Sequence, residues 1–238
     1  MKNIGVICRK ELKSYLTSPM AYVVTAIFLG LSGTFFTTYL AGTNYSDTSI
    51  RGFLNAGQIL ILLFAAVLTM RLIAEERKLG TWELLLTVPV RDTEIIVGKF
   101  LGSLAVLTGM LLLTLYYPIL LMVFGDPDLG PIFTSYLGLF LLGCASLAVG
   151  IFASSLSSNQ IVSAVVAGGI LFGLWILGIA GDFAPGAWGE LLSYMSLSRH
   201  FPDFVRGIVD TKGVVYYLSV TAVFLYLAIR STETDRWR

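Results

Sequence analysis

The sequence offers few residues whose types and spacing could do catalytic chemistry. His200 is its only histidine, and a protein-bound zinc ion needs about four donors close together. The phosphate-binding motif G-x-x-x-x-G-K-[ST] does not occur, and neither does H-E-x-x-H or G-x-S-x-G. We therefore predict a non-catalytic chain that holds no cofactor and no metal of its own. A membrane-embedded enzyme is a disfavoured alternative, because no nucleophile and base are expected at a common depth.

The most informative pattern lies between residues 71 and 90. Apolar residues recur there at helical spacing, and charged residues fall largely on the other faces. Pro89 ends the pattern, since proline cannot continue a helix. We predict a short amphipathic helix over 75–90, followed by a longer helix that Asp92 caps. This short helix is either a connector that lies among lipid headgroups or a lever that docks into a partner protein.

Composition shows what surrounds these residues. Of the 238 residues, 56% are hydrophobic and 13% are charged, whereas soluble domains average about 25% charged residues. This excludes an ordinary cytosolic enzyme. A net charge of +1 without a basic run also excludes a nucleic-acid partner. The composition therefore predicts an integral membrane protein.

Six apolar stretches are long enough to cross a bilayer, which needs about 20 apolar residues per helix. They are residues 20–41, 56–74, 100–124, 132–154, 160–180 and 213–229. A β-barrel would instead show alternating segments of about ten residues. We predict an all-α membrane protein with a single domain over 1–238. The first stretch is expected to be an uncleaved span, because its apolar run is too long for a signal peptide.

Basic residues orient the spans. With the N-terminus inside, only four of the 16 Lys and Arg residues would lie outside: Arg51, Arg199, Arg206 and Lys212. The positive-inside rule thus predicts that both termini are cytoplasmic. Every ionisable residue is expected in a terminus, a loop or the last turn of a helix. This argues against an ion-coupled carrier, which usually needs charged groups at mid-membrane.

Two further segments are not simple spans. Residues 1–18 carry one apolar stripe at helical spacing beside several basic side chains, which predicts an interfacial helix, with a plain basic tail as the alternative. Residues 181–212 predict two short outer amphipathic helices, divided near 196–198, and the bland alternative is a surface loop. Four polar residues of the outer segment could meet a substrate headgroup or an outer partner: Arg199, His200, Asp203 and Arg206.

Two glycine pairs at i, i+4 offer small faces for close helix approach, Gly98 with Gly102 and Gly169 with Gly173. Most such pairs serve packing within one chain. The two cysteines, Cys8 and Cys144, are expected at different depths, so we predict no disulfide between them.

The run Glu75-Glu76-Arg77-x-x-Gly80-Thr81-x-Glu83-Leu84-Leu85-Leu86-Thr87-x-Pro89-Val90 strongly resembles the inner loop of ABC-2 type permeases. The resemblance extends over the whole chain and looks closest to the bacterial branch that includes gliding-motility and nitrous-oxide-reductase-maturation permeases. In that family this loop is the coupling helix, which sits in a cleft of the ATPase. The resemblance therefore implies a set of ATPase-coupling residues: Glu76, Arg77, Gly80, Thr81, Trp82, Glu83, Leu84 and Pro89.

The resemblance also implies a function. The chain would be a permease subunit that exports an unidentified substrate, with ATP and Mg on a separate ATPase dimer. A second permease copy, identical or not, would complete the pathway, and Gly169 and Gly173 would lie near its interface. The implied location is a bacterial or archaeal plasma membrane. The alternative is a membrane anchor that transmits conformational change to periplasmic partners without carrying a solute.

Overall fold

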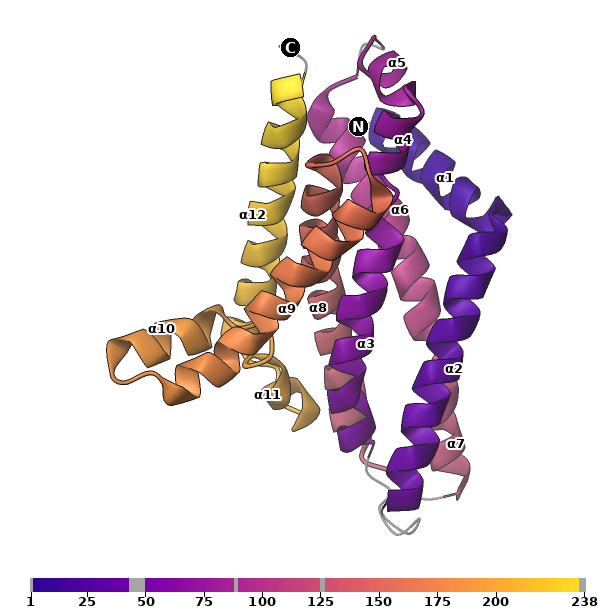
Figure 1. Ribbon diagram of the computed structural model, residues 1–238. Helices are drawn as coiled ribbons and strands as arrows, with labels where there is room; N and C mark the ends of the chain where they lie inside the picture. The colour runs from indigo at the N-terminus through magenta and orange to yellow at the C-terminus, as the bar shows by residue number, and fades with distance from the viewer. Residues whose placement is uncertain (1, 43–49, 88–89, 125–126, 236–238) are drawn as a thin grey trace.

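The computed structural model describes residues 2–42, 50–87, 90–124 and 127–235, and every regular element in these ranges is a helix (Figure 1). The helices are α1 (Lys2–Thr17), α2 (Pro19–Gly42), α3 (Arg51–Thr69), α4 (Ala74–Lys78), α5 (Thr81–Thr87), α6 (Asp92–Leu113), α7 (Tyr116–Phe124), α8 (Leu129–Ser155), α9 (Gln160–Phe183), α10 (Ala187–Met195), α11 (Phe201–Val205) and α12 (Thr211–Asp235).

Six stretches of these helices are long and apolar enough to cross a bilayer: Pro19–Gly42, Arg51–Lys78, Asp92–Phe124, Leu129–Ser155, Gln160–Phe183 and Thr211–Thr234. The prediction of an all-α, six-span membrane protein is confirmed. Most observed helices extend past the apolar runs, because a helix continues into the polar residues that flank the hydrocarbon layer. The largest difference is the third span, which begins at Asp92 rather than at residue 100. Asp92 is thus the first residue of the helix and not its cap.

The third span also breaks within the predicted range 100–124. Pro118 has no N–H to donate to the carbonyl of Thr114, four residues earlier, and α6 ends at Leu113 while α7 begins at Tyr116. The hydroxyl of Tyr136, on α8, donates to the Thr114 carbonyl at 2.9 Å. A side chain from a neighbouring helix thus satisfies the acceptor that proline leaves without its usual partner.

Helix α8 forms the centre of the bundle. It packs against α3, α6, α9, α11 and α12, and 83% of its most apolar stretch is buried. By contrast, three helices are each only 22% buried over their most apolar stretch and therefore lie at the periphery: α2, α9 and α12. Helix α8 therefore sets the positions of the helices that surround it.

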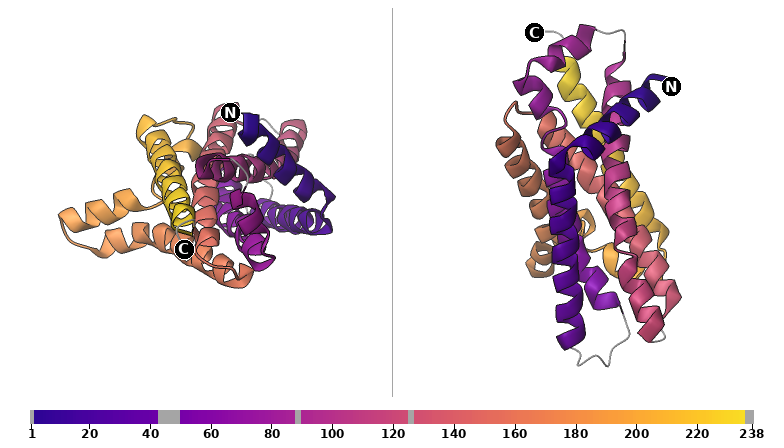
Figure 2. Two further views of the ribbon diagram at one scale, coloured as in Figure 1. Left: turned by 90° about the horizontal axis from the view of Figure 1, so that it is seen from above. Right: turned by 90° about the vertical axis from the view of Figure 1, so that its right-hand side faces the viewer.

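The two ends of the bundle differ. The start of α1, the end of α12 and the short helices α4 and α5 all lie at one end (Figure 1). There α1 packs across α6 (Figure 2). Helices α9 and α10 pack against each other and project sideways from the bundle. The predicted division of the outer segment is confirmed, since α10 ends at Met195 and α11 begins at Phe201.

Candidate coupling site

The predicted coupling segment 75–90 is not one helix. It forms α4 and α5, separated by Gly80, which has a backbone φ of +71°. That left-handed conformation is open to glycine and costs other residues free energy. The single-helix prediction was wrong because Gly80 ends α4 and lets the chain turn before α5.

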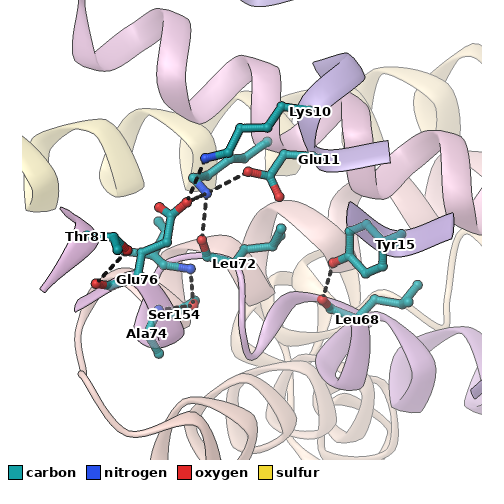
Figure 3. A network of polar contacts seen from close by, with 11 residues as sticks. Lys10, Glu11, Tyr15, Leu68, Leu72, Ala74, Glu76, Thr81 and Ser154 are labelled. Carbon is teal, nitrogen blue, oxygen red and sulfur yellow. Dashed lines mark hydrogen bonds and ion pairs between the residues drawn. The ribbon is translucent and has the colours of Figure 1, made fainter. Parts of the chain in front are cut away.

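Ser154 of α8 anchors the start of α4. Its hydroxyl accepts hydrogen bonds from the backbone N–H groups of Ile73 and of Ala74, each at 3.1 Å, and Figure 3 shows Ser154 beside Ala74. The same hydroxyl donates to the Met70 carbonyl at 3.3 Å. The first N–H groups of a helix have no partner within the helix. A side chain from the central helix therefore supplies the cap that the local sequence lacks.

Lys99 of α6 joins three parts of the chain. Its ammonium nitrogen lies 2.9 Å from Glu11 Oε1 on α1 and 2.9 Å from Glu76 Oε1 on α4, and it donates to the Leu72 carbonyl at 2.8 Å. Figure 3 shows Glu11, Glu76 and Leu72 converging on this point. We call Lys99, Glu11 and Glu76 the charge triad. It ties α1, which we call the elbow helix, to α4 of the coupling segment and to α6.

The triad corrects one sequence prediction. Every ionisable residue was expected in a terminus, a loop or the last turn of a helix, which placed Lys99 before the third span. It lies instead inside α6, with its side chain 1% exposed. An ammonium group has three protons to donate, and here it has three oxygen acceptors. Removing an ion from water costs several kcal/mol unless partners surround it. The three acceptors explain how Lys99 can be buried.

The glycine pair Gly98 and Gly102 seats α1 on α6. A Cβ atom on Gly98 would lie 2.7 Å from Ile7 Cγ2, and one on Gly102 would lie 2.7 Å from Glu11 Cβ. Both distances are shorter than carbon atoms tolerate. The predicted role of this pair in close helix approach is confirmed, and it places Glu11 within reach of Lys99.

Tyr15 attaches the other end of α1 to α3. Its hydroxyl donates to the Leu68 carbonyl at 2.6 Å, and its side chain is buried. Burial raises the pKa of the Tyr15 phenol above its ordinary value, because the charged form would lose its water. The guanidinium carbon of Arg71 lies 4.5 Å from the centre of the Tyr15 ring. Helix α1 is thus fixed at both α6 and α3.

The predicted coupling residues divide into an inner and an outer group. Trp82 is buried in the hydrophobic core, which attaches α5 to the body of the protein, and the guanidinium of the half-buried Arg77 lies 5.9 Å from the centre of its ring. Thr81 is exposed and donates to the Glu76 carbonyl at 3.2 Å. Glu83 and Leu84 are also exposed.

Together with Leu79, Glu83 and Leu84 form what we call the α5 surface; Leu79 and Leu84 are each 67% exposed. Pro89 lies outside the described residues. The exposed side chains of Leu79, Glu83 and Leu84 therefore make this end of the bundle both apolar and acidic.

The second glycine pair behaves differently from the first. Added Cβ atoms at Gly169 and Gly173 would meet nothing within 4 Å. Within the described residues this pair faces away from the chain's own helices. Its predicted role at a dimer contact stays a prediction.

The outer polar residues contact their own chain. Arg199 forms an ion pair with Asp182, and Arg206 pairs with Asp203 at 3.5 Å. The His200 ring stacks on Tyr216 with centroids 4.0 Å apart. Each of these side chains therefore has a partner within the chain. Their predicted contact with a headgroup or an outer partner stays a prediction.

Sequence reasoning missed Lys99, Glu11 and Ser154 as members of the site. Glu11 lies on a helix that was interpreted only through its basic and apolar faces, and Ser154 lies at the end of an apolar span. The sequence contained one signal for Lys99. This residue lies between Gly98 and Gly102, a pair predicted to form a face that another helix approaches closely. The identity of that helix could not be read from spacing alone.

The comparisons with known proteins agree with this architecture. The sequence matches the family described as ABC-2 family transporter protein over residues 6–236. The comparison with curated proteins found no match. The family match covers all but the first residues of α1, together with the coupling segment and all six spans. It does not support the predicted branch of gliding-motility and nitrous-oxide-reductase-maturation permeases. The chain therefore belongs to the ABC-2 family and is a multi-pass membrane component of an ABC transporter.

Proposed function

We propose that the chain is a permease subunit that docks a separate ABC ATPase on the α5 surface and receives its movement through α4. Membership of the family supports a permease role and association with an ABC ATPase. The exposed Leu79 and Leu84 support the choice of surface, since exposed apolar side chains that lie together mark interaction sites.

The observation that carries the proposal is the charge triad beneath this surface. Because Lys99 bonds to both Glu76 and Glu11, a displacement of α4 changes the position of α6 and α1 together. Ser154 adds a link from α4 to α8. Nucleotide binding would then shift the population of permease conformations by as much as the ATPase favours one over the other.

The remaining features follow from this assignment. ATP and Mg would bind the partner, and substrate export would be driven from there. The end of the bundle that carries α4, α5 and both termini would be cytoplasmic, in a bacterial or archaeal plasma membrane. A second permease copy would pack near Gly169 and Gly173, where an added Cβ meets open space.

The test is the substitution Glu83→Lys, which reverses the charge of the α5 surface without touching the buried residues. The tagged chain is purified from its own membrane, and the co-purifying ATPase is identified by mass spectrometry and by hydrolysis of ATP. We expect the variant to insert normally and to lose most of the ATPase. Glu190→Lys, an exposed change on α10, is the control and should retain it. Full retention of a stimulated ATPase by Glu83→Lys would contradict the proposed docking surface.

A second function is favoured by the α9–α10 projection. Phe183 is 85% exposed and Trp188 is 73% exposed at its tip. Exposed aromatic side chains of this kind would bind a partner protein on the outer side of the membrane. The complex would then transmit movement to that partner without transporting a solute. Reconstituted vesicles distinguish the two functions: ATP-dependent loss or gain of a labelled lipid or solute supports transport, whereas ATP-dependent capture of an outer protein without flux supports the anchor.

A further inference from the structure

A polar pocket of about 340 Å³ lies where α1 meets the end of α3 and the start of α4. Its walls carry two hydroxyl groups, Ser14 and Ser18, together with charged residues of both signs. The pocket is distinct from the α5 surface, although Leu79 borders both. It lies at the end of a predicted span, the level at which lipid headgroups would surround the protein.

Most charges in the pocket already have partners. Glu11 and Glu76 bond to Lys99, and Lys10 lies 3.5 Å from Glu76. Arg71 and Glu75 differ, because neither has an oppositely charged side chain within ion-pair distance in the part of the chain that the structure describes.

These two residues are held one helical turn apart. The backbone N–H of Glu75 donates to the Arg71 carbonyl at 3.3 Å. The Arg71 guanidinium rests on the Tyr15 ring and lies 3.4 Å from the Ser18 hydroxyl, which fixes its position. Both side chains are half-buried. The pocket therefore presents one fixed cation and one carboxylate, each available to a ligand.

An apolar path leads away from Arg71 along α2. The guanidinium lies 3.8 Å from the sulfur of Met20. From Met20, exposed apolar side chains recur every three or four residues on one face of α2, at Val23, Ile27 and Leu31. Their exposed fractions run from 37% to 55%. A chain that begins at Arg71 could follow this face into the hydrocarbon layer.

We propose that this pocket binds the headgroup of a zwitterionic aminophospholipid. The phosphate would accept hydrogen bonds from Arg71 and Ser18, because a guanidinium group matches the geometry of phosphate oxygens. The ammonium group would donate to Glu75, and an acyl chain would lie along Met20, Val23 and Ile27. An anionic lipid fits less well, because it would bring no cation to Glu75. A free phosphate compound would leave the apolar path empty.

Binding at this position would act on the coupling segment. Glu75 is adjacent to Glu76 of the charge triad, and Ser18 lies at the joint between α1 and α2. A lipid that joins Arg71, Ser18 and Glu75 would hold α1 against α4. The inference thus concerns a structural lipid and does not depend on the identity of the ATPase or of the transported substrate.

The experiment is native mass spectrometry of the delipidated, full-length protein with phosphatidylethanolamine, phosphatidylcholine and phosphatidylglycerol of identical chains. We expect phosphatidylethanolamine to bind at least about threefold more tightly than phosphatidylglycerol, which brings no cation to Glu75, the size of effect that one partly exposed charge pair gives. It should also bind more tightly than phosphatidylcholine, whose quaternary ammonium has no N–H to donate to Glu75. Glu75→Gln should remove this preference, and Arg71→Gln should weaken all three lipids. Soluble phosphoethanolamine should not compete, because it lacks the acyl chain.

Two variants serve as matched controls. Arg9→Gln removes an exposed cation from α1, and Glu190→Gln removes an exposed carboxylate from α10. Both should bind the three lipids as the unaltered chain does, and all variants are compared after the same size-exclusion step. The proposal is overturned if Glu75→Gln keeps the preference, if Arg9→Gln weakens binding as much as Arg71→Gln, or if soluble phosphoethanolamine displaces the lipid.

Discussion

The ammonium nitrogen of Lys99 lies 2.9 Å from a carboxylate oxygen of Glu76, which places a buried span residue in direct contact with the coupling segment. The same nitrogen lies 2.9 Å from Glu11 on the elbow helix. Three elements that are far apart in the sequence therefore share one charged group.

Replacing Lys99 with methionine should destabilise the protein strongly. It leaves Glu11 and Glu76 without their shared cation, and breaking a buried pair in this way costs about 3–5 kcal/mol. The measurement is the thermal unfolding midpoint in detergent. Lys10→Met, which removes an exposed cation 3.5 Å from Glu76, should cost less than about 1 kcal/mol.

Neutralising the whole triad should restore much of that stability while coupling remains impaired. Lys99→Met combined with Glu11→Gln and Glu76→Gln leaves no unpaired charge in the buried site. ATP hydrolysis by the docked complex should respond less to substrate or lipid than in the unaltered chain. A triple variant that is both stable and fully coupled would show that the triad holds the fold together without transmitting movement.

Gly98→Ala should loosen the elbow helix, because the new Cβ would lie 2.7 Å from Ile7. Overpacking of this kind costs about 1–3 kcal/mol. Gly109→Ala, on the same helix, is the matched control, since its Cβ would meet nothing within 4 Å. That control should be neutral or slightly stabilising through helix propensity. Hydrogen exchange in α1 should increase only in Gly98→Ala; equal exchange in both variants would contradict the seating role.

Ser154→Ala should release the start of α4. Two backbone N–H groups, of Ile73 and Ala74, would lose their acceptor, at a cost of about 1–2 kcal/mol. Ser146→Ala removes a buried hydroxyl from the same helix, whose one partner among the described residues is the Leu142 carbonyl. Proteolysis within residues 74–87 should accelerate in Ser154→Ala and stay unchanged in Ser146→Ala. Faster proteolysis in Ser146→Ala than in Ser154→Ala would contradict the role of Ser154 at the start of α4.

The outer segment should lose stability as the pH falls. Burial lowers the pKa of His200, while its bond to the Ser196 carbonyl and the charges of Asp210 and Asp203 act in the opposite direction. Because the folded chain binds this proton less readily than the unfolded chain, stability is greatest above the ordinary histidine pKa of about 6.5 and declines below it. The unfolding midpoint should therefore fall less between pH 7.5 and pH 5.5 in His200→Phe, and an equal fall would contradict the assignment.

The six spans and the helix boundary at Pro19, between α1 and α2, follow from residues that are neighbours in the sequence. Apolar runs of sufficient length dictate a membrane helix, and proline restricts the residue before it. The break near Thr114 was predictable as a kink at Pro118, though not its exact position. These features are set by local sterics and by the bilayer, so no knowledge of tertiary contacts was required.

The charge triad could not be predicted from the same information. Glu11, Glu76 and Lys99 become neighbours only after α1 folds back across α6. The apolar run that begins at Phe100 also placed Lys99 just outside the span, so its burial was not expected. The division between the buried Trp82 and the exposed Leu84 likewise depends on the turn at Gly80, which a continuous helical wheel cannot represent.

The central claim is that the α5 surface binds a separate ABC ATPase. A photo-crosslinking amino acid at Leu84 tests it most directly, with the same amino acid at Trp188, which is also highly exposed, as the control. We predict that Leu84 crosslinks in the native membrane to a protein whose peptides include a phosphate-binding G-x-x-x-x-G-K-[ST] motif, and that Trp188 does not. An ATPase crosslink from Trp188 and none from Leu84 would contradict the account.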